Sequence, residues 1–227
     1  MVRLSCLFAL LASFAMVLGT SNRSIAQTAY GIDDTGNLFR FDVDNPAAVT
    51  DIGNVGFVPR GIDFRPSSHL LYGLQVDVAS GQSQLYTIDI NNATPTAVGG
   101  SFPTSVLGSY NLGGGTGTLG FDFNPTTLQG DGSMRIRVVT NDSHNLRLNS
   151  MTGQIAGIDS PLPAIASVDA VAYLNNIASM AGVTKLYDMD SSTDKLYEQT
   201  PPNAGTLDQI GAFGVTIDAL SDISFDI

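Results

Sequence analysis

The sequence predicts an all-β fold, a small β-propeller built from four-stranded blades. The first of three observations is a phrase of Gly, an apolar residue, Asp, Phe, any residue and Pro, which occurs at residues 61–66 and again at 120–125. The second is a phrase of Leu, an aromatic or aliphatic residue, any residue, an apolar residue and Asp or Asn, which occurs four times, once in shortened form. The third is that helical periodicity is nearly absent after residue 26.

The first 26 residues are typical of a secretory signal peptide. Arg3 gives a positive start, residues 4–18 are apolar or small, and Ser24 and Ala26 fit a small-x-small cleavage site. The apolar run is shorter than the roughly 20 residues that span a bilayer. We therefore expect a mature chain of residues 27–227 that is secreted or periplasmic; an N-terminal membrane anchor is the alternative.

The mature chain is predicted to be strongly acidic and free of cysteine. Removing residues 1–26 takes away Cys6, Arg3 and Arg23, which leaves eight Lys and Arg against 21 acids, a net charge of −13. This charge argues against nucleic acid or an anionic membrane as partner, since both need clustered basic residues. Every acid except Glu198 is Asp, a residue that favours turns because its side chain binds local backbone N–H groups.

The two phrases combine into a unit of four short strands, each ending at a turn. Three units are complete and a first unit lacks its opening strand, which residues 223–227 at the other end of the chain resemble. The predicted strands lie at residues 29–33, 38–42 and 48–53; 61–65, 70–76, 84–90 and 96–99; 120–124, 134–139, 145–149 and 154–157; and 169–174, 184–190, 195–200 and 206–210.

Units of this spacing and strand number are typical of propeller blades. We expect residues 27–227 to form one domain, with 61–66 and 120–125 as the innermost strands of successive blades. Gly allows close approach near the axis, and Pro ends the strand. Pairing of the N- and C-terminal strands is expected to close the ring, which would leave few exposed sheet edges. A β-sandwich is the alternative architecture.

The order of the phrases identifies a family resemblance. "GIDFRPSSHLLYGL", "LYTID", "LGFDFNPT", "RIRVVTNDSHNLRLN", "LYDMD" and the final "FDI" follow one another along nearly all of the mature chain. In this the chain resembles a bacterial secreted family catalogued as domain of unknown function 4394. The resemblance implies propeller-like repeats and export, but no catalytic residue. Members of that family continue past "FDI" with another blade-like segment, so a truncated five-bladed form stays open beside four blades.

Three aspartates are candidate calcium ligands. Asp63, Asp122 and Asp226 occupy equivalent positions in the expected inner strands, and converging carboxylates are the ligands that hard cations prefer. The aligned position in the fourth unit is Ala172, so a complete ring of carboxylates is not expected. The alternative is structural: each Asp accepts backbone N–H bonds and fixes the turn to the next strand. No cofactor is required by any pattern in the sequence.

Other candidate sites are weaker. The run "DMDSSTDKLYE" (residues 188–198) lacks the Gly and Glu of an EF-hand, so an Asp-rich hairpin turn is favoured over a loose calcium site. The residues "GTGTLG" (115–120) lack the strand before and the helix after that a dinucleotide site needs. Arg135, Arg137 and Arg147 are expected to pair with aspartates of their own blade, with an anion-binding patch as the alternative.

The sequence favours a binding or interaction module over an enzyme. It contains two His and one Glu, which leaves Asp as the main source of acid–base groups. Expected ligands are a divalent cation, a glycan or another exported protein. An Asp-based hydrolase or lyase at the channel mouth, with or without calcium dependence, is one alternative, and clustering of Asp63 and Asp122 with a buried neighbour would favour it. A structural repeat protein of the cell surface or matrix is another.

Overall fold

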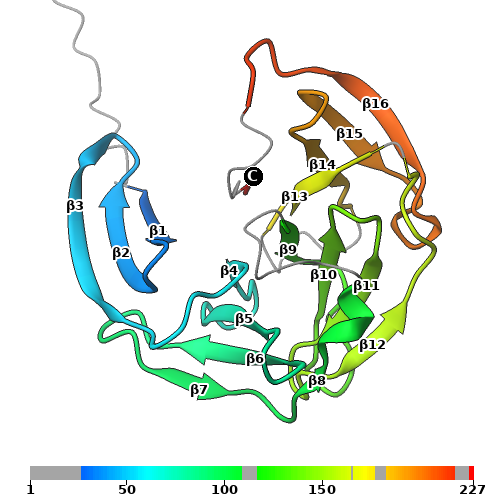
Figure 1. Cartoon of the computed structure of the whole chain (residues 1–227). Coiled ribbons are helices and arrows are strands. Elements are labelled where there is room, and N and C mark those ends of the chain that lie inside the picture. Colours follow the sequence, from blue (N-terminus) through cyan, green and yellow to red (C-terminus); the bar gives the residue numbers. More distant parts are fainter. Residues whose placement is uncertain (1–26, 109–116, 165, 177–182, 218–224) are drawn as a thin grey trace, which may run out of the picture.

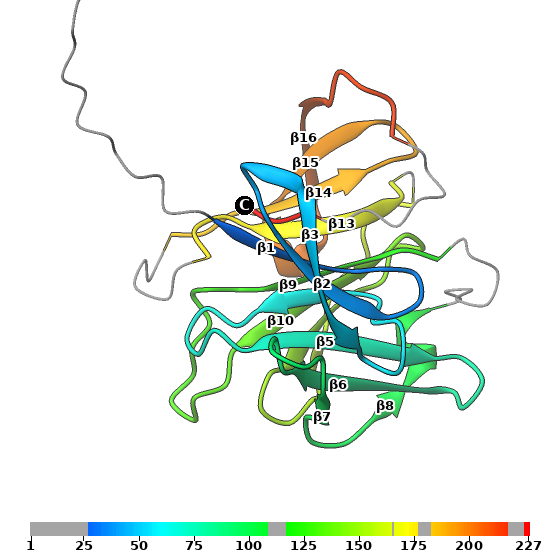
Figure 2. The ribbon, with the colours of Figure 1, turned by 90° about the vertical axis from the view of Figure 1, so that its left-hand side faces the viewer.

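The computed structural model describes residues 27–108, 117–164, 166–176, 183–217 and 225–227. These residues form strands and two short 3₁₀ helices, arranged as four antiparallel sheets around a central axis (Figure 1). The side view shows the strands of successive sheets stacked as blades (Figure 2). The predicted all-β propeller with four blades is therefore confirmed. The predicted signal peptide lies outside the described residues.

Each blade is a meander in which the chain runs from the axis to the rim. Blade 1 contains β1 (Thr28–Ile32), β2 (Asn37–Asp42) and β3 (Asn45–Asn54). Blade 2 contains β4 (Ile62–Phe64), β5 (Leu71–Asp77), β6 (Gln82–Ile88), β7 (Pro95–Ala97) and β8 (Phe102–Pro103). Blade 3 contains β9 (Leu119–Phe123), β10 (Arg135–Thr140), β11 (Asn145–Asn149) and β12 (Ile155–Ile158). Blade 4 contains β13 (Val168–Tyr173), β14 (Leu186–Asp190), β15 (Lys195–Gln199) and β16 (Leu207–Ala212).

Burial falls from the inner strand of a blade to the outer strand. Every residue of β9 and β13 is buried, whereas β3 at the rim is exposed over most of its length. The inner strands β9 and β13 are covered on both faces by neighbouring blades, so their residues are buried without alternation, as in other doubly covered strands. The phrases at residues 61–66 and 120–125 do contain the inner strands β4 and β9, as the sequence predicts.

Apolar side chains between neighbouring blades form the core. Leu38 and Leu71 belong to the cluster between blades 1 and 2, and Leu74 and Ile136 to the cluster between blades 2 and 3. A third cluster joins blades 3 and 4 and includes Val139, Val171 and Leu186. Full burial of one such side chain contributes about 1.5–3 kcal/mol, so these three contacts hold the blades in place without a disulfide.

The predicted closure of the ring by terminal strands is wrong. Within the described residues β1 pairs only with β2, and residues 225–227 form no strand and pair with none. The C-terminal residues lie near the axis instead (Figure 1). Phe225 shares a small cavity there with Gly61, Gly120 and Ala170, residues of the three inner-strand segments whose side chains are absent or small. Residues 223 and 224 of the expected strand lie outside the described part of the chain.

Two glycines let the inner strands approach one another. A Cβ at Gly61 would lie 2.4 Å from the Cβ of Phe121, and a Cβ at Gly120 would lie 2.7 Å from the backbone N of Val171. Both contacts are far shorter than ordinary van der Waals distances, so the sequence prediction of close approach near the axis is correct.

Gly120→Ala is expected to lower the free energy of unfolding by about 1–3 kcal/mol, the usual cost of overpacking a core. The added methyl meets backbone of β13, which cannot rotate away. Gly130→Ala is the matched control, since a Cβ there would contact nothing within 4 Å. Urea denaturation of both variants measures the difference. Equal stability of Gly120→Ala and the wild type would contradict the packing described for the inner strands.

Candidate functional site

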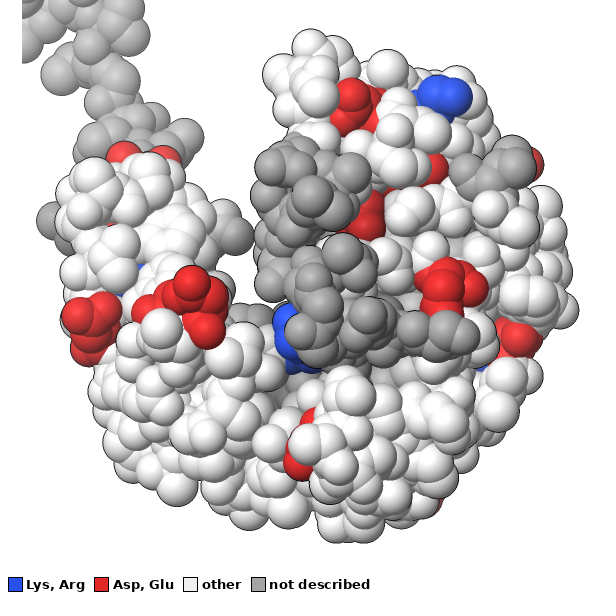
Figure 3. Space-filling model, viewed as in Figure 1, with Lys and Arg blue, Asp and Glu red and all other residues white. Residues whose placement is uncertain are grey.

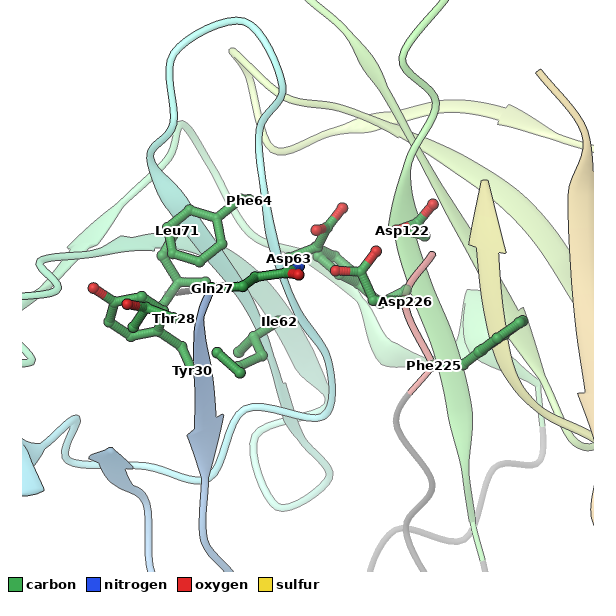
Figure 4. Close-up of a pocket in the computed structure, with 12 residues that line it drawn as sticks. Gln27, Thr28, Tyr30, Ile62, Asp63, Phe64, Leu71, Asp122, Phe225 and Asp226 are labelled. Atoms are coloured by element: carbon green, nitrogen blue, oxygen red, sulfur yellow. The ribbon is translucent and has the colours of Figure 1, made fainter. Parts of the chain in front are cut away.

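A pocket of about 290 Å³ lies where the inner parts of blades 1, 2 and 3 meet the C-terminal residues. Asp63 of β4, Asp122 of β9 and Asp226 all line it, so the structure brings the three sequence-predicted aspartates together (Figure 4). The complete lining is Gln27, Thr28, Ala29, Tyr30, Ile62, Asp63, Phe64, Leu71, Phe121, Asp122, Phe225 and Asp226.

The two inner-strand aspartates join each blade to the next. Oδ2 of Asp63 accepts a hydrogen bond from the backbone N–H of Phe123 at 2.7 Å, and Oδ2 of Asp122 accepts one from the backbone N–H of Tyr173 at 2.6 Å. Phe123 and Tyr173 each follow the position equivalent to Asp63 in the next blade, so the bonds repeat around the axis. Ala172 occupies that position in blade 4, and the series stops there. The donors belong to the next blade and not to the aspartate's own turn.

Asp63 and Asp122 also form a hydrogen-bonded carboxyl pair. Both side chains are buried, with residue exposures of 8% and 2%. Burial raises the pKa of Asp63 to about 7, although the hydrogen bonds from Phe123 and Asp122 oppose the shift. Burial, and then the neighbouring charge of Asp63, raise the pKa of Asp122 well above its usual range. Two carboxyls in this contact cannot both ionise easily, so the pair retains a proton near neutral pH.

Asp226 adds a third carboxyl to the pocket. Burial raises the pKa of its carboxyl, and its charge in turn raises the pKa of both Asp63 and Asp122. In the part of the chain that the structure describes, no three His, Cys, Asp or Glu side chains are arranged to hold a metal ion. Calcium binding by Asp63, Asp122 and Asp226 thus stays a prediction.

The rest of the pocket lining was not identified from the sequence. Gln27, Thr28 and Tyr30 come from the start of blade 1, Phe64 supplies an aromatic ring, and the side chain of Phe225 points away from the other lining residues. The Tyr30 and Phe64 rings meet edge to face with centroids 5.3 Å apart. The side chain of Gln27 extends toward Asp63 and Asp226 (Figure 4). Phe64 and Phe225 stand beside Asp63 and Asp226 in the inner-strand phrases, but nothing in those phrases marks the two residues as pocket lining. Gln27, Thr28 and Tyr30 lie outside both repeated phrases.

The run "DMDSSTDKLYE" forms the β14–β15 hairpin. Oδ1 of Asp190 accepts hydrogen bonds from the N–H groups of Ser192 and Thr193, which is the turn-fixing role that the sequence favours. Asp188 instead points into the protein and is fully buried. Burial raises the pKa of its carboxyl well above the usual range, and the charge of Arg137 only partly opposes this shift.

Two of the three predicted arginines pair with one aspartate of their own blade. Nη1 of Arg137 lies 2.7 Å from Oδ2 of Asp159, and Nη2 of Arg147 lies 2.7 Å from Oδ1 of the same residue. Asp159 was not singled out in the sequence, although it lies just past β12, the strand beside Arg147. Arg135 donates to the hydroxyl of Ser133 instead. Acidic side chains are spread over the surface, and basic ones gather at few places on the face drawn in Figure 3.

Fold and pocket together define a β-propeller with a carboxyl-lined central pocket. A family model described as "Domain of unknown function (DUF4394)" matches residues 37–227, and the chain belongs to this family. No curated protein matches the chain. Within the described residues, no helix is long and apolar enough to cross a membrane.

Several solved structures are similar to the chain at low sequence identity. One is a protein of unknown function from Bacteroides thetaiotaomicron VPI-5482, with 14% identity and a TM-score of 0.48 over 81% of this chain and 40% of that one. A putative exo-β-1,3-galactanase from Bifidobacterium bifidum s17 is 12% identical, with a TM-score of 0.40 over 75% of this chain and 61% of that one. The PQQ-bound aldose sugar dehydrogenase of Streptomyces coelicolor is 11% identical, with a TM-score of 0.40 over 84% of this chain and 87% of that one. The chain thus spans less than two thirds of the first two structures.

The buried carboxyl pair predicts an unusual pH dependence of stability. A carboxyl with a raised folded-state pKa binds more protons in the folded state, so its contribution is present at low pH. For Asp63 this contribution is lost as pH rises from about 4 toward 7, at up to about 1.4 kcal/mol per pH unit. Asp122→Asn keeps the hydrogen bond with Tyr173 and removes one titrating carboxyl.

The free energy of unfolding of Asp122→Asn should therefore rise relative to that of the wild type between pH 4 and 7. Urea denaturation at several pH values measures this difference, and Asp208→Asn on the exposed part of β16 is the control. A difference that stays constant over this pH range would show that the pair holds no extra proton.

Proposed function

We propose that the protein is an exported binding module whose central pocket takes a neutral, hydroxyl-rich ligand, a glycan. The observation that carries this proposal is the composition of the pocket lining. Carboxyl, amide and hydroxyl groups are placed beside aromatic and aliphatic side chains in one concave site. Small-ligand sites commonly combine an apolar lining with a few placed polar groups.

The polar groups suit sugar hydroxyls. Ionised carboxylates only accept hydrogen bonds, and each hydroxyl can donate one. Asp226 is partly exposed in the pocket, and Thr28 and Gln27 add groups that donate and accept. The ring of Phe64 offers apolar surface for the C–H face of a sugar ring.

The charge of the pocket selects against anionic ligands. Three carboxyls line it and no basic side chain does. The net charge of the predicted mature chain is −13 as well, so an acidic molecule is repelled at long range and in the pocket. A neutral oligosaccharide carries no such penalty.

Calorimetric titration with maltotetraose, cellotetraose and laminaritetraose tests the proposal. At least one is expected to bind, and Asp226→Asn should weaken that binding about tenfold or more, because a hydrogen bond to a charged group contributes about 1.5–3 kcal/mol. Asp208→Asn, which lies on the rim strand β16, should bind as the wild type does. Absence of binding by all three, or equal binding by Asp226→Asn, would contradict a neutral glycan in this pocket.

Calcium in the same pocket has a separate test. If Asp63, Asp122 and Asp226 bind calcium, the ion raises the melting temperature relative to excess chelator, since a ligand at a hundred times its Kd stabilises by about 2.7 kcal/mol. Asp122→Asn should abolish that increase. Identical melting temperatures with calcium and with chelator would contradict calcium binding in this pocket. The hydrogen bonds of Asp63 and Asp122 to the next blade would then be the role of these carboxyls that the structure supports.

A second candidate function is an Asp-based hydrolase. The specific observation in its favour is the hydrogen-bonded pair of Asp63 and Asp122 with raised pKa values, because proton-sharing aspartates serve as acid and base in known hydrolases. Incubation with the same three oligosaccharides and measurement of new reducing ends tests it. The binding-module proposal expects no release. Release that Asp63→Asn abolishes would favour the hydrolase.

A structural role at the cell surface or in a matrix is a third candidate. It requires self-association of the exported chain, which sedimentation at increasing protein concentration measures. The binding-module proposal expects no concentration-dependent association.

Export to the periplasm or the exterior follows from the proposed signal peptide. N-terminal sequencing of the exported protein tests it, and the expected first residue is Gln27.

A further inference from the structure

A second pocket, of about 240 Å³, lies between blades 3 and 4 and contains three arginines and no acid. Its lining is Asn124, Thr127, Arg135, Arg137, Arg147, Tyr173, Pro201, Pro202 and Asn203. It is separate from the central pocket but adjoins it through Tyr173. The backbone N–H of Tyr173 binds Asp122 at the central pocket, and its hydroxyl accepts a hydrogen bond from Nε of Arg137 here at 3.4 Å.

Arg137 is a buried residue of the pocket wall, with only 2% of its side chain exposed. Its Nη1 donates to Asn145 at 2.6 Å and to Asp159 at 2.7 Å, and its Nη2 donates to Oδ1 of Asn203 at 2.7 Å. These bonds fix the plane of the guanidinium. A guanidinium held this way loses little entropy when an anion binds, which favours recognition of planar or tetrahedral oxyanions.

The positive charge around this pocket exceeds the negative charge. Arg137 and Arg147 share the single carboxylate of Asp159. Asp188 also feels the charge of Arg137, but its two carboxyl oxygens accept no hydrogen bond from the described residues. Burial raises the pKa of Asp188 well above the usual range, which favours the neutral form of this carboxyl over the charged form.

Free donors remain at the pocket wall. Arginine has five N–H groups, and those of Arg147 that bind Asp159 are on Nε and Nη2. Its Nη1 has no hydrogen-bond acceptor among the described residues. Arg135 uses only Nη1, on the Ser133 hydroxyl, and its charge also reaches the exposed carboxylate of Asp131.

Gly157 lets Arg147 hold this position. The two residues lie opposite each other on β11 and β12, and a Cβ on Gly157 would lie 2.6 Å from Nη2 of Arg147. The guanidinium of Arg147 therefore lies directly over Gly157 of β12, and Arg147 lines the pocket. A side chain at residue 157 would displace it.

We propose that this pocket, lined by Arg135, Arg137 and Arg147, binds the anionic group of an external ligand. A carboxylate, such as that of a uronic acid, and a sulfate or phosphate group share the required chemistry. Three arginines, two of which share the single carboxylate of Asp159, give this pocket a local positive charge, although the net charge of the predicted mature chain is −13, so an anion is attracted here. The ligand's neutral part would lie along Pro201, Pro202 and Asn203.

Calorimetric titration of the secreted protein with sodium sulfate, sodium phosphate and sodium D-glucuronate tests this site, with glucose as the neutral probe. Ionic strength is held constant with sodium chloride. At least one anion should bind and glucose should not. Binding of glucuronate alone identifies a carboxylated sugar, and binding of sulfate or phosphate alone identifies an ester group; each supports the site. Failure of all three anions to bind overturns it.

Two variants locate the binding. Arg135→Gln should weaken it about tenfold, since Arg135 contacts no carboxylate of the core. Asn203→Asp keeps an oxygen acceptor for Nη2 of Arg137 and adds a negative charge, so it should abolish anion binding without lowering the melting temperature in sodium chloride. Arg40→Gln, at the exposed residue of β2, is the control and should bind as the wild type does. Anion binding that both Arg135→Gln and Asn203→Asp leave unchanged would overturn the assignment.

Discussion

The structure depends on one repeated interaction, a carboxylate of an inner strand bound to the backbone N–H of the next inner strand. Asp63 makes it from blade 2 to blade 3, and Asp122 makes it from blade 3 to blade 4. A buried N–H group without a partner is costly, so each aspartate satisfies a donor that no strand pairing reaches. The same two side chains then form the wall of the central pocket. Asp63 and Asp122 therefore both join the blades and line the candidate site.

Much of the fold could be predicted from the sequence because repetition supplies its own internal comparison. The phrase that contains Asp63 and the phrase that contains Asp122 each mark an inner strand, and Gly61 and Gly120 mark the close approach of strands. Closure of the ring was predicted wrongly, because residues 223–227 resemble an inner strand in pattern. Pattern cannot tell that Phe225 lies among small residues near the axis instead of in a strand beside β1.

The candidate sites were predictable only in part, for a physical reason. The grouping of three aspartates followed from their equivalent positions, but their shared proton depends on burial and on their mutual contact. Neither the burial of these side chains nor their contact with one another can be read from a sequence repeat. Gln27, Thr28 and Tyr30 come from the incomplete first unit, and Asn203 comes from a turn between strands. Such residues have no counterpart to align, so only the folded arrangement places them in a pocket.

The most direct test of the central claim is the infrared spectrum of the protein near pH 6, with Asp122→Asn subtracted from the wild type. The account predicts a band of a protonated carboxyl in the wild type that the variant lacks. Asp188 contributes equally to both spectra and cancels. A difference spectrum that contains only an ionised carboxylate would contradict a proton shared by Asp63 and Asp122, and with it the pocket chemistry proposed for this propeller.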